Sequence, residues 1–127
     1  PYNFALWESE AWLAQANRRQ DHREQMARIV AQISEIPQGT PVILAGDFNA
    51  PAGDAIFRLL RPRMRDAFEE AGIGWPNTIF NDKPLARIDQ IWINDGFRAS
   101  ALVVKKTEHS DHRMVIADLI VEGPTER

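Results

Sequence analysis

Five residues that could act together on a phosphate ester lie in three short motifs of this 127-residue chain. Asp47 and Asn49 follow one apolar run, Asp89 lies in a second, and Asp111 and His112 precede a third. Carboxylate oxygens are ligands that Mg²⁺ prefers, and an imidazole can donate to a phosphate oxygen or transfer a proton. The set suits a hard metal ion and metal-assisted attack of water on a phosphate ester.

Each of these residues also has a plain structural interpretation when it is taken singly. An Asp after a strand is usually a turn or helix cap, and Asp47 fits that role. The isolated Asp89 carries almost no information, and the adjacent Asp111 and His112 could be a surface pair. The three motifs in this order, each at the end of an expected strand, favour the functional interpretation.

Strands must position these motifs at one edge of a sheet. The continuous apolar run over 41–46 predicts a buried strand that is covered on both faces. Apolar residues also predict strands over 87–93, 97–107 and 114–121. Asn94-Asp95-Gly96 is a hairpin-type turn signal between the first two of these later strands.

Helices and loops account for the rest of the chain. Apolar residues at helical spacing predict a helix over 17–36, which Pro37 ends, whereas 1–16 reads as an irregular loop or a short helix. Short helical segments are expected over 51–60 and 64–71, and 75–86 is expected to be a loop with a short strand at 78–80. The fold class is therefore α/β or α+β.

Composition limits the classes of protein to consider. The chain is 44% hydrophobic and 26% charged, which is typical of a globular domain. Its net charge of −3 and pI of 5.6 provide no global basic field for nucleic acid. It has no cysteine, which excludes disulfides and thiolate metal sites. No signal peptide or membrane-spanning stretch is visible, so the cytoplasm is the default expectation.

The three motifs, in this order and spacing, resemble the C-terminal half of the catalytic domain in the endonuclease/exonuclease/phosphatase superfamily, which is deoxyribonuclease I-like. The resemblance covers roughly residues 25–121. It implies an α/β fold, the C-terminal half of a four-layer sandwich with two mixed β-sheets face to face and helices outside. It also implies a Mg²⁺- or Mn²⁺-dependent phosphoesterase acting on a small molecule, a lipid or nucleic acid.

The resemblance further implies a role for each motif residue. Asp47 would activate or orient the attacking water and contribute to metal binding, and Asn49 would position phosphate or water. Asp111 would help to bind the metal ion. His112 would contact the scissile phosphate, and Asp89 would hold its ring. Whether Asp47 or His112 is the general base stays open, as does the choice between phosphomonoesters and phosphodiesters.

Other residues have two interpretations each. Arg87 is a candidate for substrate binding or for structural pairing, and Trp75 could stack on a base or a lipid or be a packed aromatic. The cluster Arg58, Arg61, Arg63 and Arg65 is expected to be a solvated face rather than a phosphate track. His109 is expected to be a bystander. A nuclease, and a non-catalytic interaction domain that keeps the fold, are the alternative functions.

The chain departs from the family pattern in its first residues. The metal-binding Glu that the N-terminal half normally supplies is absent, and neither Glu8 nor Glu10 lies in a strand-like context. His22 is expected to be solvated. Residues 1–127, which begin with Pro, are expected to be a partial domain that lacks its N-terminal half. An exposed sheet face is then expected, covered by the aromatic residues in 2–12 or by a homodimer or swapped assembly, with weak activity.

Overall fold

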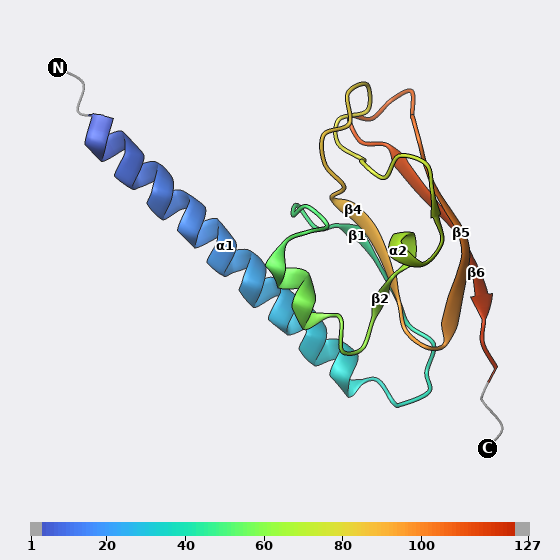
Figure 1. Cartoon of the computed structure of the whole chain (residues 1–127). Helices are drawn as coiled ribbons and strands as arrows, with labels where there is room; N and C mark the ends of the chain where they lie inside the picture. Colours follow the sequence, from blue (N-terminus) through green and yellow to red (C-terminus); the bar gives the residue numbers. More distant parts are fainter. Residues whose placement is uncertain (1–3, 124–127) are drawn as a thin grey trace. The chain divides into compact units, whose positions relative to one another are not determined.

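The computed structural model describes residues 4–123 (Figure 1). They fall into two units, which divide between Ile36 and Pro37. The first unit is helix α1, from Phe4 to Glu35. The second contains two three-stranded sheets, two short helices and the loops that carry the three motifs.

Helix α1 confirms the helix predicted over 17–36. The irregular loop or short helix expected over 1–16 is wrong for residues 4–16, which continue the same helix. Residues 4–35 contain no glycine or proline, so no strong helix breaker interrupts α1. The side chains of residues 1–12 lie outside the described part of the chain, so the expected cover by aromatic residues in 2–12 stays a prediction.

The first sheet of the second unit has the order β1-β4-β2, with antiparallel neighbours throughout. The second has the order β3-β5-β6, in which β3 is parallel and β6 antiparallel to β5. The strands are β1 Ile43–Asp47, β2 Arg65–Asp66, β3 Gly72–Ile73, β4 Asp89–Ile93, β5 Phe97–Lys105 and β6 Met114–Val121. The expected α/β class with mixed sheets is confirmed.

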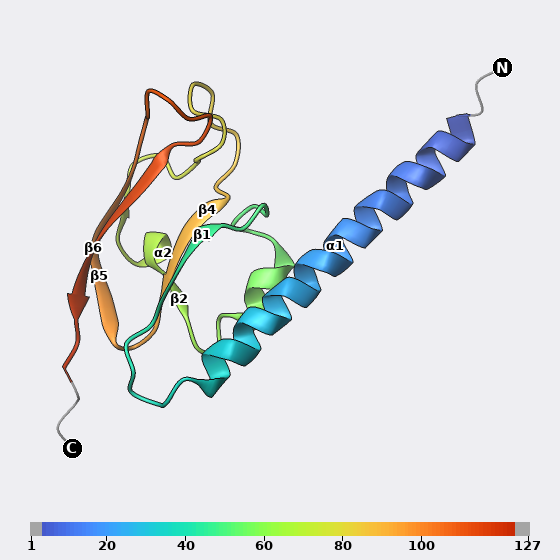
Figure 2. The same cartoon turned by 180° about the vertical axis from the view of Figure 1, so that it is seen from behind.

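The core of the second unit lies between the two sheets. Ile93 of β4 and Leu102 of β5 are buried there, together with Ala67 of helix α2, Ala67–Ala71. Figure 1 and Figure 2 show α2 between β4 and the β5–β6 pair from opposite sides. Asp66 caps α2 by accepting from the Phe68 N–H at 3.0 Å, which fixes where this helix begins.

The other face of β4 is covered as well. Trp92 is fully buried and stacks on Phe57, with 5.6 Å between ring centroids. Phe57 belongs to the 3₁₀ helix η1, Ala55–Leu59, which Asp54 caps. The short helix expected over 51–60 is therefore present in 3₁₀ form. Because β4 is buried on both faces, its first residue, Asp89, has a fixed position.

The first strand differs from its prediction. The run over 41–46 overlaps β1, Ile43–Asp47, but is not buried on both faces, since Ile43 is 48% exposed and most of β1 is open to solvent. Among the described residues, β1 pairs only with β4 and forms the edge of its sheet. The apolar composition signalled a strand covered on both faces, but most residues of β1 are exposed within the described part of the chain.

The turn at Asn94-Asp95-Gly96 is also different from its prediction. It does not join the strands of a hairpin, because β4 and β5 belong to different sheets. The Asn94 side chain accepts from the Val42 N–H at 2.9 Å and donates to the Thr40 carbonyl at 2.8 Å. The turn is therefore tied to the segment before β1, and the chain crosses there from one sheet to the other.

Strand β5 contains one extra residue. The register with β6 runs Ala99↔Leu119 and then Ala101↔Asp118, which leaves Ser100 without a paired residue. The bulge lets Ala99 and Leu102, three residues apart, both face the core. The short strand expected over 78–80 is absent: Ile79 makes isolated bridges to Ala86 and His112 instead.

Candidate active site

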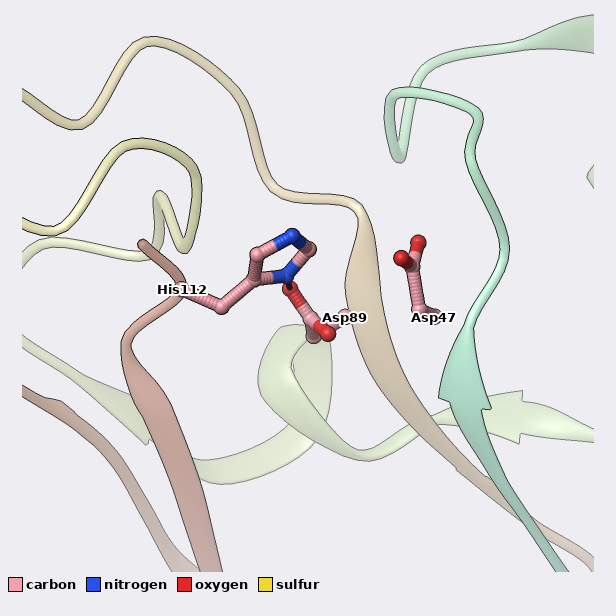
Figure 3. A group of neighbouring side chains, drawn as sticks. All are labelled: Asp47, Asp89 and His112. Atoms are coloured by element: carbon pink, nitrogen blue, oxygen red, sulfur yellow. Dashed lines mark hydrogen bonds and ion pairs between the residues drawn. The ribbon is translucent and has the colours of Figure 1, made fainter. Parts of the chain in front are cut away.

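Strand pairing brings the first two motifs together. Asp47 is the last residue of β1 and Asp89 the first of β4, and the antiparallel register places them directly opposite each other. The third motif belongs to the other sheet, because His112 lies just before β6. An isolated bridge to Ile79 holds the backbone of His112. Residues far apart in the sequence thus meet at one end of β4 (Figure 3).

The three side chains form a close group. His112 Nδ1 lies 2.8 Å from Asp89 Oδ2, and one ligand atom each from Asp47, Asp89 and His112 lie within 4.8 Å of one another. A carboxylate accepts, so Nδ1 carries the proton and donates to Asp89. This fixes the imidazole ring and leaves Nε2 as the nitrogen available to a substrate.

The electrostatic environment favours the charged imidazole. The pKa of His112 is raised above its ordinary value, chiefly because the hydrogen bond to Asp89 stabilises the imidazolium. Partial burial opposes this, and the negative charges of Asp89, Asp47 and Asp111 reinforce it. A charged His112 is a hydrogen-bond donor at both ring nitrogens, which suits contact with an anionic phosphate.

Asp47 stabilises the turn that follows β1 and also contributes a carboxylate to the close group. Asp47 Oδ1 accepts from the Asn49 N–H at 2.8 Å, and Asn49 adopts a left-handed backbone with φ of 50°. Asn tolerates this conformation better than most residues. The Phe48 N–H also donates to the Ile88 carbonyl at 2.9 Å, which ties the turn to the segment before Asp89. Asp47 and Asn49 both stay exposed, and Asp47 lies in the close group with His112.

The remaining predicted residues are placed differently. Asp111 is exposed and is not part of the close group, although its charge acts on His112. Arg87 donates from both terminal guanidinium nitrogens to the Asp66 carboxylate. Of its two expected roles, the structure shows the structural pairing. Trp75 is 62% exposed and is not a packed aromatic. His109 is exposed, away from the close group.

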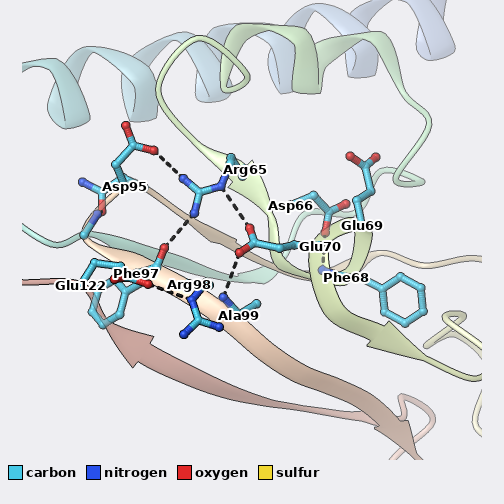
Figure 4. Close-up of polar contacts among 12 residues, drawn as sticks. Arg65, Asp66, Phe68, Glu69, Glu70, Asp95, Phe97, Arg98, Ala99 and Glu122 are labelled. Atoms are coloured by element: carbon cyan, nitrogen blue, oxygen red, sulfur yellow. Dashed lines mark hydrogen bonds and ion pairs between the residues drawn. The ribbon is translucent and has the colours of Figure 1, made fainter.

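The arginine cluster takes part in ion pairs. Arg61 binds Glu69, and Arg65 binds Glu70, Asp95 and the Phe97 carbonyl, as Figure 4 shows for Arg65. The cluster is thus not simply a solvated face. A hollow of about 290 Å³ lies beside it, lined in part by Arg58, Arg61 and Arg87. Two of the arginines that line this hollow already have carboxylate partners: Arg61 binds Glu69, and Arg87 binds Asp66.

Sequence reasoning missed Thr78. This residue is fully buried, and its Oγ1 accepts from the N–H groups of Ile88 and Asp89, each at 3.2 Å. Asn81 was also missed, and it contacts the segment that carries His112. Both lie in a stretch that reads as a loop, and loop residues that hold a site carry no periodic signal.

Comparison with known proteins gives a consistent result. The sequence model of the Endonuclease/Exonuclease/phosphatase family matches residues 4–112. The uncharacterized protein YbhP of Escherichia coli strain K12 is 31% identical over 106 residues, which are 80% of this chain and 42% of that protein. The chain thus spans less than half the length of this relative.

Solved structures show the same fold. A mannosyl-6-phosphatase from Bacteroides thetaiotaomicron matches with a TM-score of 0.71 at 20% identity, over 80% of this chain and 46% of that one. An endonuclease/exonuclease/phosphatase from Bacteroides vulgatus matches with a TM-score of 0.69 at 23% identity, over 81% and 45%. Within residues 4–123, no helix combines the length and apolar character that crossing a membrane requires.

Proposed function

Because the chain belongs to the Endonuclease/Exonuclease/phosphatase family, whose members are hydrolases of phosphate esters, we propose that Asp47, Asp89 and His112 form the catalytic group of a metal-dependent phosphoesterase. The observation that carries the proposal is the 2.8 Å contact between His112 Nδ1 and Asp89, opposite Asp47. The residues are of the types and in the proximity that metal-assisted attack of water on phosphorus requires.

Asp47 and Asp111 would hold the metal ion, and the donor set fits a hard cation. Enzymes of this family generally depend on a metal ion. Both side chains are exposed carboxylates, which suit Mg²⁺ or Mn²⁺, whereas the Asp89 oxygen is taken by His112. When bound, the ion would neutralise phosphate charge and lower the pKa of a bound water.

Asp47 and His112 would then move protons in opposite directions. Water attacks phosphorus and gives a proton to Asp47, while the bond from phosphorus to the leaving oxygen breaks and the charged His112 protonates that oxygen. The raised pKa of His112 supports its role as the donor rather than the general base. Asn49, exposed on the same turn, would bind a phosphoryl oxygen, and Asp89 would keep the ring oriented.

The substrate class has two candidates, phosphomonoesters and phosphodiesters. The mannosyl-6-phosphatase with the same fold supports a small phosphomonoester. A nuclease remains the alternative, but the net charge of −3 gives it no support within this chain. Trp75, exposed in the loop between β3 and β4, is available to stack on a base or another flat group, whereas Arg87 is held by Asp66.

Full activity would need more of the domain than this chain contains. The chain spans 42% of its relative YbhP, and among the described residues one edge of β1 has no pairing strand while Ile43 is exposed. We therefore expect low turnover unless the rest of the domain, or a second copy in a homodimer or swapped assembly, covers that edge. Gel filtration with light scattering measures which of these forms the chain adopts.

The deciding experiment measures hydrolysis of p-nitrophenyl phosphate and bis-p-nitrophenyl phosphate with Mg²⁺ or Mn²⁺. It compares this chain with a version extended upstream, and each with its His112→Ala variant. Turnover that needs metal and His112 supports the phosphoesterase, and the preferred ester identifies the substrate class. Turnover that persists unchanged in His112→Ala contradicts the assignment. No turnover in either folded form favours a non-catalytic interaction domain.

A further inference from the structure

The contact between Asp89 and His112 joins residues that belong to different sheets. Asp89 begins β4, in the sheet with β1 and β2, whereas His112 precedes β6, in the sheet with β3 and β5. No strand pairing connects these two sheets directly among the described residues. The 2.8 Å contact between His112 Nδ1 and Asp89 Oδ2 therefore depends on the residues that connect the start of β4 to the segment before β6.

Thr78 contacts both segments. Its Oγ1 accepts from the N–H groups of Ile88 and Asp89, and its carbonyl accepts from the Arg113 N–H at 2.7 Å. The residue is fully buried, with an exposed fraction of 0%, so water does not compete for these bonds. One residue thus holds the backbone of Asp89 on one side and the neighbour of His112 on the other.

Asn81 holds the His112 segment from a second direction. Its N–H donates to the Asp111 carbonyl at 2.6 Å, and its carbonyl accepts from Arg113 Nε at 2.8 Å. Its side-chain amide makes two bonds to the backbone of Thr107, at 2.6 and 2.9 Å. Thr107 in turn donates its hydroxyl to the His112 carbonyl at 2.9 Å.

We propose that Thr78 and Asn81 are positioning residues that set the separation of Asp89 and His112, an inference that rests on the proposed function for its catalytic meaning. Neither residue belongs to the close group of Asp47, Asp89 and His112, so each would act through the residues that it holds. Thr78 fixes the start of β4, and Asn81 fixes the turn that carries His112. Thr78 and Asn81 lie at the two ends of the short segment 78–81, and hydrogen bonds hold both ends. A shift of either residue would therefore change the distance from His112 Nδ1 to the Asp89 carboxylate.

The test uses the Nδ1 proton of His112, observed directly by proton NMR on this chain at fixed pH without metal. Thr78→Val keeps the side-chain shape but removes the hydroxyl acceptor, and Thr78→Ser restores it. We expect exchange of the Nδ1 proton with water to rise about tenfold or more in Thr78→Val and in Asn81→Ala, and to stay near the original rate in Thr78→Ser.

Asn94→Ala is the matched control, because Asn94 also ties two backbone segments through its side-chain amide but lies beyond the far end of β4. It should lower stability without changing the Nδ1 signal. An unchanged signal in both Thr78→Val and Asn81→Ala overturns the inference, as does an equal change in Asn94→Ala. If Thr78→Val does not fold, Asn81→Ala and Thr78→Ser decide the question alone.

Turnover provides a separate measurement. In a form of the protein that hydrolyses p-nitrophenyl phosphate, loss of positioning should lower kcat about tenfold or more with little change in KM, and Thr78→Ser should recover it. Absence of turnover in the original chain would count against the proposed function only. A changed Nδ1 signal would still establish the positioning role, so the two failures are distinguishable.

Discussion

Asp66 and Arg87 form a two-pronged ion pair inside the second unit, with nitrogen–oxygen distances of 2.9 and 2.6 Å. Only 1% of the Asp66 side chain is exposed and 11% of the Arg87 side chain. The same carboxylate caps α2 through the Phe68 N–H. The pair therefore joins the start of α2 to the segment that leads into Asp89.

Removing one partner of this pair should be costly. We expect Asp66→Ala to lower the free energy of unfolding by about 3 kcal/mol or more, because a charge stays buried without its partner and a helix cap is lost. Glu69→Ala is the control, since it breaks the exposed pair with Arg61, worth about 0–1 kcal/mol. Urea unfolding of both variants measures the difference, and equal losses would contradict the expectation.

Stability should depend on pH through His112. Its pKa is raised in the folded chain, so folding favours the protonated ring. The stabilisation is fully present below the ordinary value of 6.5 and is lost as the pH rises through the raised pKa. An NMR titration of the imidazole together with urea unfolding at several pH values checks this. In Asp89→Asn the pKa should fall towards its ordinary value, and a pKa below that value in the original chain would contradict the prediction.

Asp47→Asn should separate chemistry from structure. The amide keeps an Oδ1 acceptor for the Asn49 N–H, so the turn should persist and the melting temperature should change little. It cannot take a proton, so kcat should fall by about a hundredfold to ten-thousandfold in any form that turns over. Steady-state kinetics and thermal unfolding are measured on the same preparation. Retained activity would remove Asp47 from the proposed mechanism.

Metal binding can be tested without a substrate. We expect Mn²⁺ to raise the melting temperature in proportion to the logarithm of its concentration once it exceeds the Kd. Asp47→Asn and Asp111→Asn should each weaken this effect, because each removes a charged oxygen ligand. Asp95→Asn serves as the control, since Asp95 is an exposed carboxylate at the opposite end of β4. A similar loss in all three variants would indicate non-specific attraction.

The sequence predicted the strands that carry Asp47 and Asp89. The apolar runs before Asp47 and around Asp89 predict two strands, and the structure shows that these strands pair and so bring the two carboxylates together. The structure places the Asp89 side chain next to His112, a contact that only the family resemblance led us to expect. Periodicity could not place His112, because its position depends on how one sheet packs against another.

Local signals failed where the outcome depended on distant residues. The Asn94 turn carries a hairpin signal, but a turn motif does not determine whether its flanking strands pair with each other. The composition of β1 indicates a covered strand without showing what covers it. Arg87 could not be assigned to pairing, since its partner Asp66 is 21 residues away in the chain.

Because of the bulge at Ser100, we expect strand β5 to tolerate the loss of one residue. The residues on either side, Ala99 and Ala101, keep consecutive partners in β6, so Ser100 is surplus to the ladder. Its hydroxyl donates to the Asp118 carbonyl from outside the regular pairing. Deleting Ser100 would straighten the strand while both inward-facing sets of side chains stay inward. Ser100 is thus a position in the second sheet where removing one residue would change the twist of β5 while the core side chains keep their places.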